Sequence, residues 1–173
     1  MALAAGLNVD YAGSMVIAEE NPRNWAVGGY DISEAAAAID GWLTSHTVRP
    51  YVDNYVFFIN FGVLNAADET EANFKSSYLY VIDALQANFP GCVIFVTYPG
   101  SGIVTTRHDL IAPWLTDIIA TRSNVYAGDD EETSFKGVDN YATYYYDLLH
   151  YNALAHAEKV VALRARMLAV LGF

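Results

Sequence analysis

The sequence predicts an α/β fold in which helices cover a parallel sheet. Short runs of apolar, β-branched and aromatic residues alternate along the chain with segments whose apolar residues recur at helical spacing. Residues 55–61 (YVFFINF) and 92–98 (CVIFVTY) lack the regular polar–apolar alternation of a strand with one wet face. Such strands are buried on both faces, as in a parallel sheet between helical layers. The 173 residues, 54% of them apolar, suffice for one domain with a sizeable core, and we expect a single domain over residues 1–173.

The first half of the chain contributes two strands and one helix to this pattern. Residues 7–12 predict a short strand directly after the stop signal of Gly6. Residues 32–45 (ISEAAAAIDGWLTS) predict a helix. Residues 55–61 are β-branched and aromatic, which indicates a buried strand.

The second half continues the alternation. A predicted helix over residues 69–88 ends at Pro90-Gly91 and is followed by a strand over 92–98. The remaining elements are a helix over 110–121 with Pro113 in its early turns, a brief strand over 125–127 and a last helix over 154–171. The apolar face of helix 69–88 is formed by Phe74, Tyr78, Val81, Ile82 and Leu85. The outer side of the last helix is expected to carry Glu158, Lys159, Arg164 and Arg166.

An open parallel sheet binds its ligands at the carboxyl ends of its strands. The segments that follow the predicted strands are therefore the first place to look for a site. They are residues 13–14, 62–65, 99–101 and 128–152. The last of them contains the acidic run 129–132, which we expect to be a solvated loop.

Charge and cysteine content exclude several classes of function. The chain has 20 acidic and 9 basic residues, a net charge of −11, so we expect no nucleic-acid partner and no membrane partner. The single cysteine, Cys92, excludes an intrachain disulfide and a cysteine-built zinc site, and is expected in the core. His46, His108 and His156 lack metal-ligand spacing with each other and with Asp147, so we expect no metal and no other cofactor.

The sequence also lacks the usual membrane and secretion signals. No apolar run reaches the roughly 18 residues that a membrane span needs. The start, MALAAG, has no basic region and too short an apolar stretch for a secretory signal. A cytoplasmic location is therefore the default expectation.

Asp147 and His150 form the most informative local pattern. A carboxylate three residues before a histidine on a turn can reach the imidazole Nδ1–H, fix its tautomer and stabilise the imidazolium. Nε2 is then free to act as a general base. By spacing alone, a histidine that caps the following helix is the competing interpretation.

Two further segments are candidates for a binding site. Asn65 follows the buried strand 55–61, where a polar side chain faces the binding crevice. Gly28-Gly29 precedes a helix start at Asp31 or Ser33, so its backbone N–H groups are suited to an anionic oxygen. An ordinary turn and a loop-capping asparagine are the structural alternatives.

Three stretches resemble blocks of the SGNH, or GDSL-type, hydrolase family. Residues 146–154 (YDLLHYNAL) are similar to its last block, an Asp-x-x-His turn that leads into the terminal helix. Residues 54–65 (NYVFFINFGVLN) are similar to its third block, a strand that ends in Gly-x-Asn-Asp, and residues 26–32 (AVGGYDI) to its second, whose glycine donates to the oxyanion. The blocks occur in the family's order. The family consists of esterases and lipases, so the resemblance implies a flavodoxin-like α/β/α sandwich and ester hydrolysis.

The resemblance also implies roles for individual residues. His150 is the base, Asp147 orients it, and Gly29 and Asn65 hold the oxyanion. The family's spacing places its asparagine where this chain has Leu64, one residue before Asn65. Either the loop carries a one-residue shift or the side-chain donor is lost, and losing one such donor typically costs about 100- to 1000-fold in rate.

The family's opening block, a strand that ends in Gly-Asp-Ser, has no counterpart in this sequence. Residues 3–14 (LAAGLNVDYAGS) resemble the segment after that block, so we expect an N-terminally truncated fold with a vacant central strand position. Strand 7–12 moves into the vacancy and makes Ser14 the nucleophile, a second copy covers it in a homodimer, or the chain is inactive. We favour Ser14, which follows a strand and a glycine; Ser101 falls in a predicted surface loop and Ser33 suits a helix N-cap.

These residues predict a serine esterase that hydrolyses small, acetyl-type carboxylic esters through an acyl-enzyme. Ser14 attacks, His150 takes its proton, and Asp147 orients His150. The missing Gly-Asp-Ser block and Leu64 motivate an alternative, an inactive carbohydrate- or protein-binding module on a decayed hydrolase scaffold. A carbohydrate deacetylase of the same family is a third possibility.

Overall fold

The computed structural model describes residues 31–45, 55–62, 69–100, 106–131, 135, 143–145 and 152–172. All of them belong to one compact unit that begins at Asp31. Its elements follow in the order α1 (Ile32–Ser45), β1 (Val56–Ile59), α2 (Glu71–Asn88), β2 (Val93–Tyr98), α3 (Thr106–Ala120), β3 (Val125–Asp130) and α6 (Ala153–Leu171). The predicted α/β class is confirmed, and the predicted strand over 7–12 lies outside the described residues.

The three strands form a parallel sheet in the order β1-β2-β3. Val56 of β1 pairs with Val93 of β2, and the next residue of β2, Ile94, pairs with Val125 of β3. Each connection between neighbouring strands contains a helix, as parallel strands require. The sheet therefore has all its carboxyl ends at one edge.

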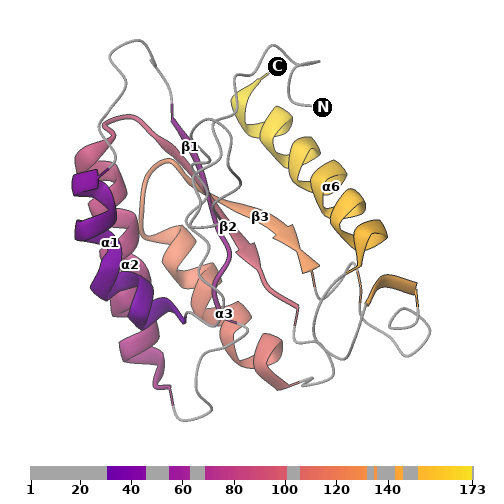
Figure 1. The fold of residues 1–173 in the computed structure, drawn as a ribbon, viewed down its shortest axis with the longest axis horizontal. Coiled ribbons are helices and arrows are strands. Elements are labelled where there is room, and N and C mark those ends of the chain that lie inside the picture. The colour runs from indigo at the N-terminus through magenta and orange to yellow at the C-terminus, as the bar shows by residue number, and fades with distance from the viewer. Residues whose placement is uncertain are drawn as a thin grey trace. The chain divides into compact units, whose positions relative to one another are not determined.

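Helices lie on both faces of this sheet. The Tyr98 hydroxyl of β2 lies 3.0 Å from the Thr116 hydroxyl of α3, so α3 covers the face to which Tyr98 points. Asp130, the register partner of Tyr98, approaches α3 as well, whereas the adjacent Asp129 lines a hollow with residues of α6. Since neighbouring strand residues point to opposite faces, α6 covers the other side. Figure 1 shows α1, α2 and α3 along one side of the strands and α6 beside β3.

The α2 helix supplies much of the core beneath the sheet. Its Phe74, Tyr78, Val81, Ile82 and Leu85 are buried, which confirms the face predicted from their spacing. Thr70 caps the helix by accepting a hydrogen bond from the Asn73 backbone N–H at 3.2 Å. The rings of Phe74 and Tyr78 lie 5.3 Å apart, and the Phe74 ring lies 5.4 Å from that of Trp114 on α3. Aromatic packing thus joins α2 to α3.

The other face of the sheet carries an aromatic row across all three strands. Phe58, Phe95 and Tyr126 are partners in register, with ring centroids 5.6 Å and 6.0 Å apart. Phe95 is fully buried, but Phe58 and Tyr126 are 42% and 36% exposed. The expectation of burial on both faces therefore holds for the central strand and is wrong for β1, because the described elements leave the face of Phe58 partly uncovered.

Helix α1 begins with a capping box rather than with a serine cap. The Asp31 carboxylate accepts hydrogen bonds from the backbone N–H groups of Ser33 and Glu34 and from the Ser33 hydroxyl, at 2.8, 2.9 and 2.7 Å. The Glu34 carboxylate accepts in return from the Asp31 N–H at 2.9 Å. Ser33 is therefore part of the helix start, not its N-cap, and its hydroxyl is engaged there.

Candidate site at the carboxyl ends of the strands

The predicted catalytic and oxyanion residues lie outside the described residues. They are Ser14, Gly29, Asn65, Asp147 and His150. The alternatives Leu64 and Ser101 also lie outside the described residues. The structure does describe the backbone on which two of these segments begin or end. Gly62 leads into the segment that carries Asn65, and Asn152 follows the segment that carries Asp147 and His150.

Gly62 is the point where the chain leaves β1. Its φ of +133° is a conformation that residues with a side chain rarely adopt. A Cβ at this position would lie 2.4 Å from Ile111 Cδ1 of α3 and 3.2 Å from the Pro99 ring. The glycine therefore allows the end of β1 to pack directly against α3, and this fixes the start of the segment that carries Asn65.

Asn152 anchors the chain where α6 begins. Its side-chain oxygen accepts from the backbone N–H groups of Leu154 and Ala155, at 3.0 and 3.1 Å, and so caps the helix. Its side-chain amide donates to the Thr143 carbonyl at 2.7 Å, and its backbone N–H donates to the Tyr144 carbonyl at 2.8 Å. Both flanks of the segment 146–151 are thereby held together.

A buried carboxylate, Glu131, lies at the end of β3 and connects the strand ends. It is 1% exposed. Its Oε1 accepts from the Asn60 side-chain amide at 2.9 Å, and its Oε2 accepts from the Gly100 backbone N–H at 3.3 Å. Lys159 of α6 forms an ion pair with the same carboxylate. One side chain therefore contacts the residues that follow β1 and β2 and the helix on the far face.

This arrangement corrects two expectations. The run 129–132 is not simply a solvated loop, since Asp129 and Glu131 are buried and β3 extends to Asp130. Lys159 does not lie on the outer side of α6, because it reaches Glu131. Lys159 is four residues after Ala155, and helical residues at this spacing share a face. Ala155 is fully buried.

A bulge in the sheet brings Asp129 to the α6 side. Val96 pairs with Ala127 and Tyr98 with Asp130, so two steps on β2 correspond to three on β3. Gly128 fits the bulge because a Cβ there would meet Thr97 Oγ1 at 3.0 Å. Asp129 is 7% exposed, and in the part of the chain that the structure describes its Oδ2 has no hydrogen-bond partner.

The environment of Asp129 disfavours its charged form. Burial raises the pKa of this carboxyl, and the negative charge of Glu131 raises it further, while Lys159 acts in the opposite direction. Asp129 also lines a hollow of about 320 Å³ with Phe135 and with Glu158, Val161 and Ala162 of α6.

A histidine between two carboxylates lies at the same edge of the sheet. His108 Nε2 is 3.3 Å from Asp130 Oδ1, and His108 Nδ1 is 3.6 Å from Asp109 Oδ1. No local pattern in the sequence indicates this pairing, because Asp130 approaches His108 only through the fold. Within the described ranges no group of three or more histidine, cysteine or acidic side chains is arranged to hold a metal ion.

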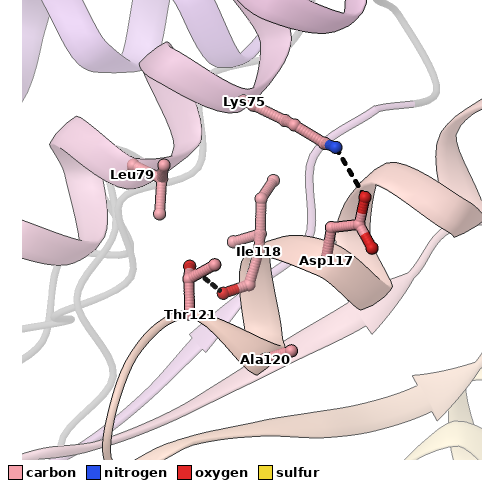
Figure 2. A pocket seen from close by; sticks show the side chains of 6 residues that line it. All are labelled: Lys75, Leu79, Asp117, Ile118, Ala120 and Thr121. Carbon is pink, nitrogen blue, oxygen red and sulfur yellow. Dashed lines mark hydrogen bonds and ion pairs between the residues drawn. The ribbon is translucent and has the colours of Figure 1, made fainter.

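Two other features lie outside this site. A hollow of about 380 Å³ lies between α2 and α3 and is bordered by Lys75 and Asp117, whose charged atoms pair at 2.7 Å. Figure 2 shows the side chains that line it. Cys92 is buried, as expected, and its burial raises the pKa of its thiol to about 11. That thiol is protonated at neutral pH and unsuited to nucleophilic attack.

Comparison with known proteins identifies similar folds. No protein-family model and no curated protein matches the chain. The solved structure of a family 3 carbohydrate esterase from Clostridium thermocellum is similar over 98% of this chain and 84% of that one, with a TM-score of 0.68 and 17% identity. A family 2 carbohydrate esterase from the same organism, in complex with cellohexaose, is similar over 75% of this chain, with a TM-score of 0.58 and 20% identity.

These similarities establish an esterase-like α/β fold. The matched region spans 38% of the length of the family 2 esterase. In the structure's described part no helix is long and apolar enough to span a membrane.

Proposed function

We propose that this chain is a serine-type carbohydrate esterase that removes acetyl groups, or similarly short acyl groups, from sugar hydroxyls. The observation that carries the proposal is the likeness to the fold of a family 3 carbohydrate esterase, which extends over 98% of the chain. The Asp147-x-x-His150 pattern before the last helix supplies the catalytic pair that such a reaction needs.

The proposed mechanism has two steps. Ser14 Oγ attacks the ester carbonyl while His150 Nε2 takes the hydroxyl proton and Asp147 stabilises the imidazolium. The tetrahedral oxyanion is held by the Gly29 N–H and the Asn65 side-chain amide, and its collapse expels the sugar alcohol, which receives the proton from His150. Water, activated by His150, then hydrolyses the acyl-Ser14 and releases the carboxylic acid.

The hydrogen bonds of Asn152, next to the proposed catalytic turn, support the proposal. Asn152 holds the segment after His150 through four hydrogen bonds of 2.7–3.1 Å to Thr143, Tyr144, Leu154 and Ala155. Hydrogen bonds next to the segment that carries the base favour a fixed orientation of the base during the reaction. The parallel strands bring Gly62, after which the segment with Asn65 begins, to the same edge of the sheet as the end of β3.

Hydrolysis of p-nitrophenyl acetate and of acetylated xylo- and cello-oligosaccharides tests this proposal. We expect turnover in the wild type, its loss in Ser14→Ala and in His150→Ala, and a decrease of about 100- to 1000-fold in Asn65→Ala. His156→Ala, which changes an exposed histidine on α6, is the matched control and should leave kcat unchanged. Full activity in His150→Ala would contradict the proposed mechanism.

A binding module without catalysis is the second candidate. The absence of Gly-Asp-Ser in the sequence favours it. It predicts that cello-oligosaccharides bind equally well to the wild type and to His150→Ala, with no ester hydrolysis by either. Any hydrolysis that depends on His150 excludes it.

A further inference from the structure

We propose that Glu131 is a positioning residue for the esterase site, a role that rests on the proposed function. Its carboxylate accepts a hydrogen bond from Asn60, which precedes the segment that carries Asn65, and pairs with Lys159 on the helix that follows His150. Glu131 makes three contacts, each to a different part of the fold.

Each contact of Glu131 comes from a distant part of the sequence. Asn60, whose amide lies 2.9 Å from Oε1, is 71 residues away, and Gly100, whose N–H lies 3.3 Å from Oε2, is 31 residues away. Lys159 pairs with Oε1 from α6. A single side chain with 1% exposure therefore joins the ends of β1, β2 and β3 to the helix on the far face.

Two of the residues that Glu131 contacts lie close in the sequence to the proposed catalytic groups. Asn60 comes five residues before Asn65, and Lys159 lies on the helix that begins three residues after His150. Gly62 precedes the segment that carries Asn65 and packs against α3, and Asn152 follows the segment that carries His150 and donates to the Thr143 carbonyl. We therefore expect a shift of Glu131 to disturb the residues from which these two segments continue, and misplacement of reacting groups by about 1 Å can lower a rate 100-fold.

A carboxylate is required because all of its partners are donors. The Asn60 amide, the Gly100 N–H and the Lys159 ammonium all donate, and a glutamate accepts from all of them. A glutamine at this position has one amide group that donates, so it opposes at least one of these donors. It also removes the negative charge with which Lys159 forms its ion pair.

The test compares steady-state kinetics of Glu131→Gln and Asn60→Ala with the wild type, using p-nitrophenyl acetate well below the melting temperature of each variant. We expect kcat to fall about tenfold or more in Glu131→Gln, with KM within about threefold, because the reacting groups and not the binding surface are displaced. Asn60→Ala is expected to give a smaller loss of kcat. Asp117→Asn is the control, since it removes a carboxylate that pairs with Lys75 outside this site, and should keep kcat within about twofold.

The double variant Asn60→Ala/Glu131→Gln separates positioning from general stability. If both residues act through one contact, its kcat equals that of Glu131→Gln alone. Additive losses, or a kcat of Glu131→Gln equal to that of the wild type, overturn the positioning role and leave the esterase proposal intact. If Glu131→Gln does not fold, the same criterion applies to Asn60→Ala, whose kcat must fall while its KM stays within threefold. A wild type without any hydrolysis overturns both proposals.

Discussion

Asp129 and Glu131 lie one residue apart, but their carboxylates have different surroundings. Both oxygens of Glu131 accept hydrogen bonds, and Lys159 pairs with its charge. Asp129 is also buried, and among the described residues its Oδ2 has no donor. The site therefore contains two buried acids near one lysine. Asp129 is the acid whose buried negative charge is the less compensated, and this charge destabilises the fold.

The buried charge of Asp129 lowers the free energy of unfolding by an amount that depends on pH. The folded pKa of Asp129 lies above its ordinary value of 3.8, so between these two pH values the folded chain holds a proton that the unfolded chain has lost. Stability therefore falls as the pH rises through that interval. We expect Asp129→Asn to be more stable than the wild type at pH 7, with the difference shrinking toward pH 4. Urea unfolding at both pH values measures this.

Glu158→Gln is a suitable control for that experiment. Glu158 lines the same hollow but is exposed, and it accepts a hydrogen bond from the Tyr144 hydroxyl at 3.2 Å. Its replacement should not increase stability at pH 7. A lower stability of Asp129→Asn than of the wild type at pH 7 would show that the Asp129 charge is compensated.

At the scale of the element, Gly62 controls how β1 ends. The substitution Gly62→Ala introduces a Cβ into a backbone conformation with φ of +133° and places it 2.4 Å from Ile111 Cδ1. We expect a decrease in the free energy of unfolding of about 2 kcal/mol or more, from backbone strain and overpacking together. Denaturant unfolding measures it.

Two variants separate the strain from the steric contact. Gly91→Ala also introduces a side chain at a positive φ, +81°, but its Cβ has no neighbour within 4 Å, so it should cost less. Ile111→Val removes the Cδ1 atom and should recover part of the loss when it is combined with Gly62→Ala. Equal effects of Gly62→Ala and Gly91→Ala would argue against a role for the contact with Ile111.

The sequence predicts the regular parts of these elements and not their irregular ends. Periodicity identifies the buried face of α2 because burial repeats every three or four residues. The last three residues of β3, Gly128 to Asp130, are polar or glycine and do not resemble a strand. They pair with β2 through a bulge, and their burial depends on α3 and α6, which no local pattern reveals.

At the scale of the whole molecule, the described unit is a parallel sheet with helices on both faces (Figure 1). The α/β class follows from the alternation of elements, and the resemblance to SGNH hydrolases agrees with the esterase-like fold of the similar structures. The connection of three strand ends through Glu131 and Lys159 was not predictable, since a run of acids ordinarily lies in solvent. The catalytic residues remain predictions from the sequence, because they lie outside the described residues.

Labelling with a serine-reactive phosphonate tests the claim that Ser14 is a nucleophile activated by His150. The wild type and His150→Ala are incubated with the reagent and digested, and the modified peptides are identified by mass spectrometry. We expect an adduct on Ser14 in the wild type and at most a trace of it in His150→Ala, because the base is needed for attack. An adduct on another serine, equal labelling of both proteins, or no serine adduct at all would contradict the claim.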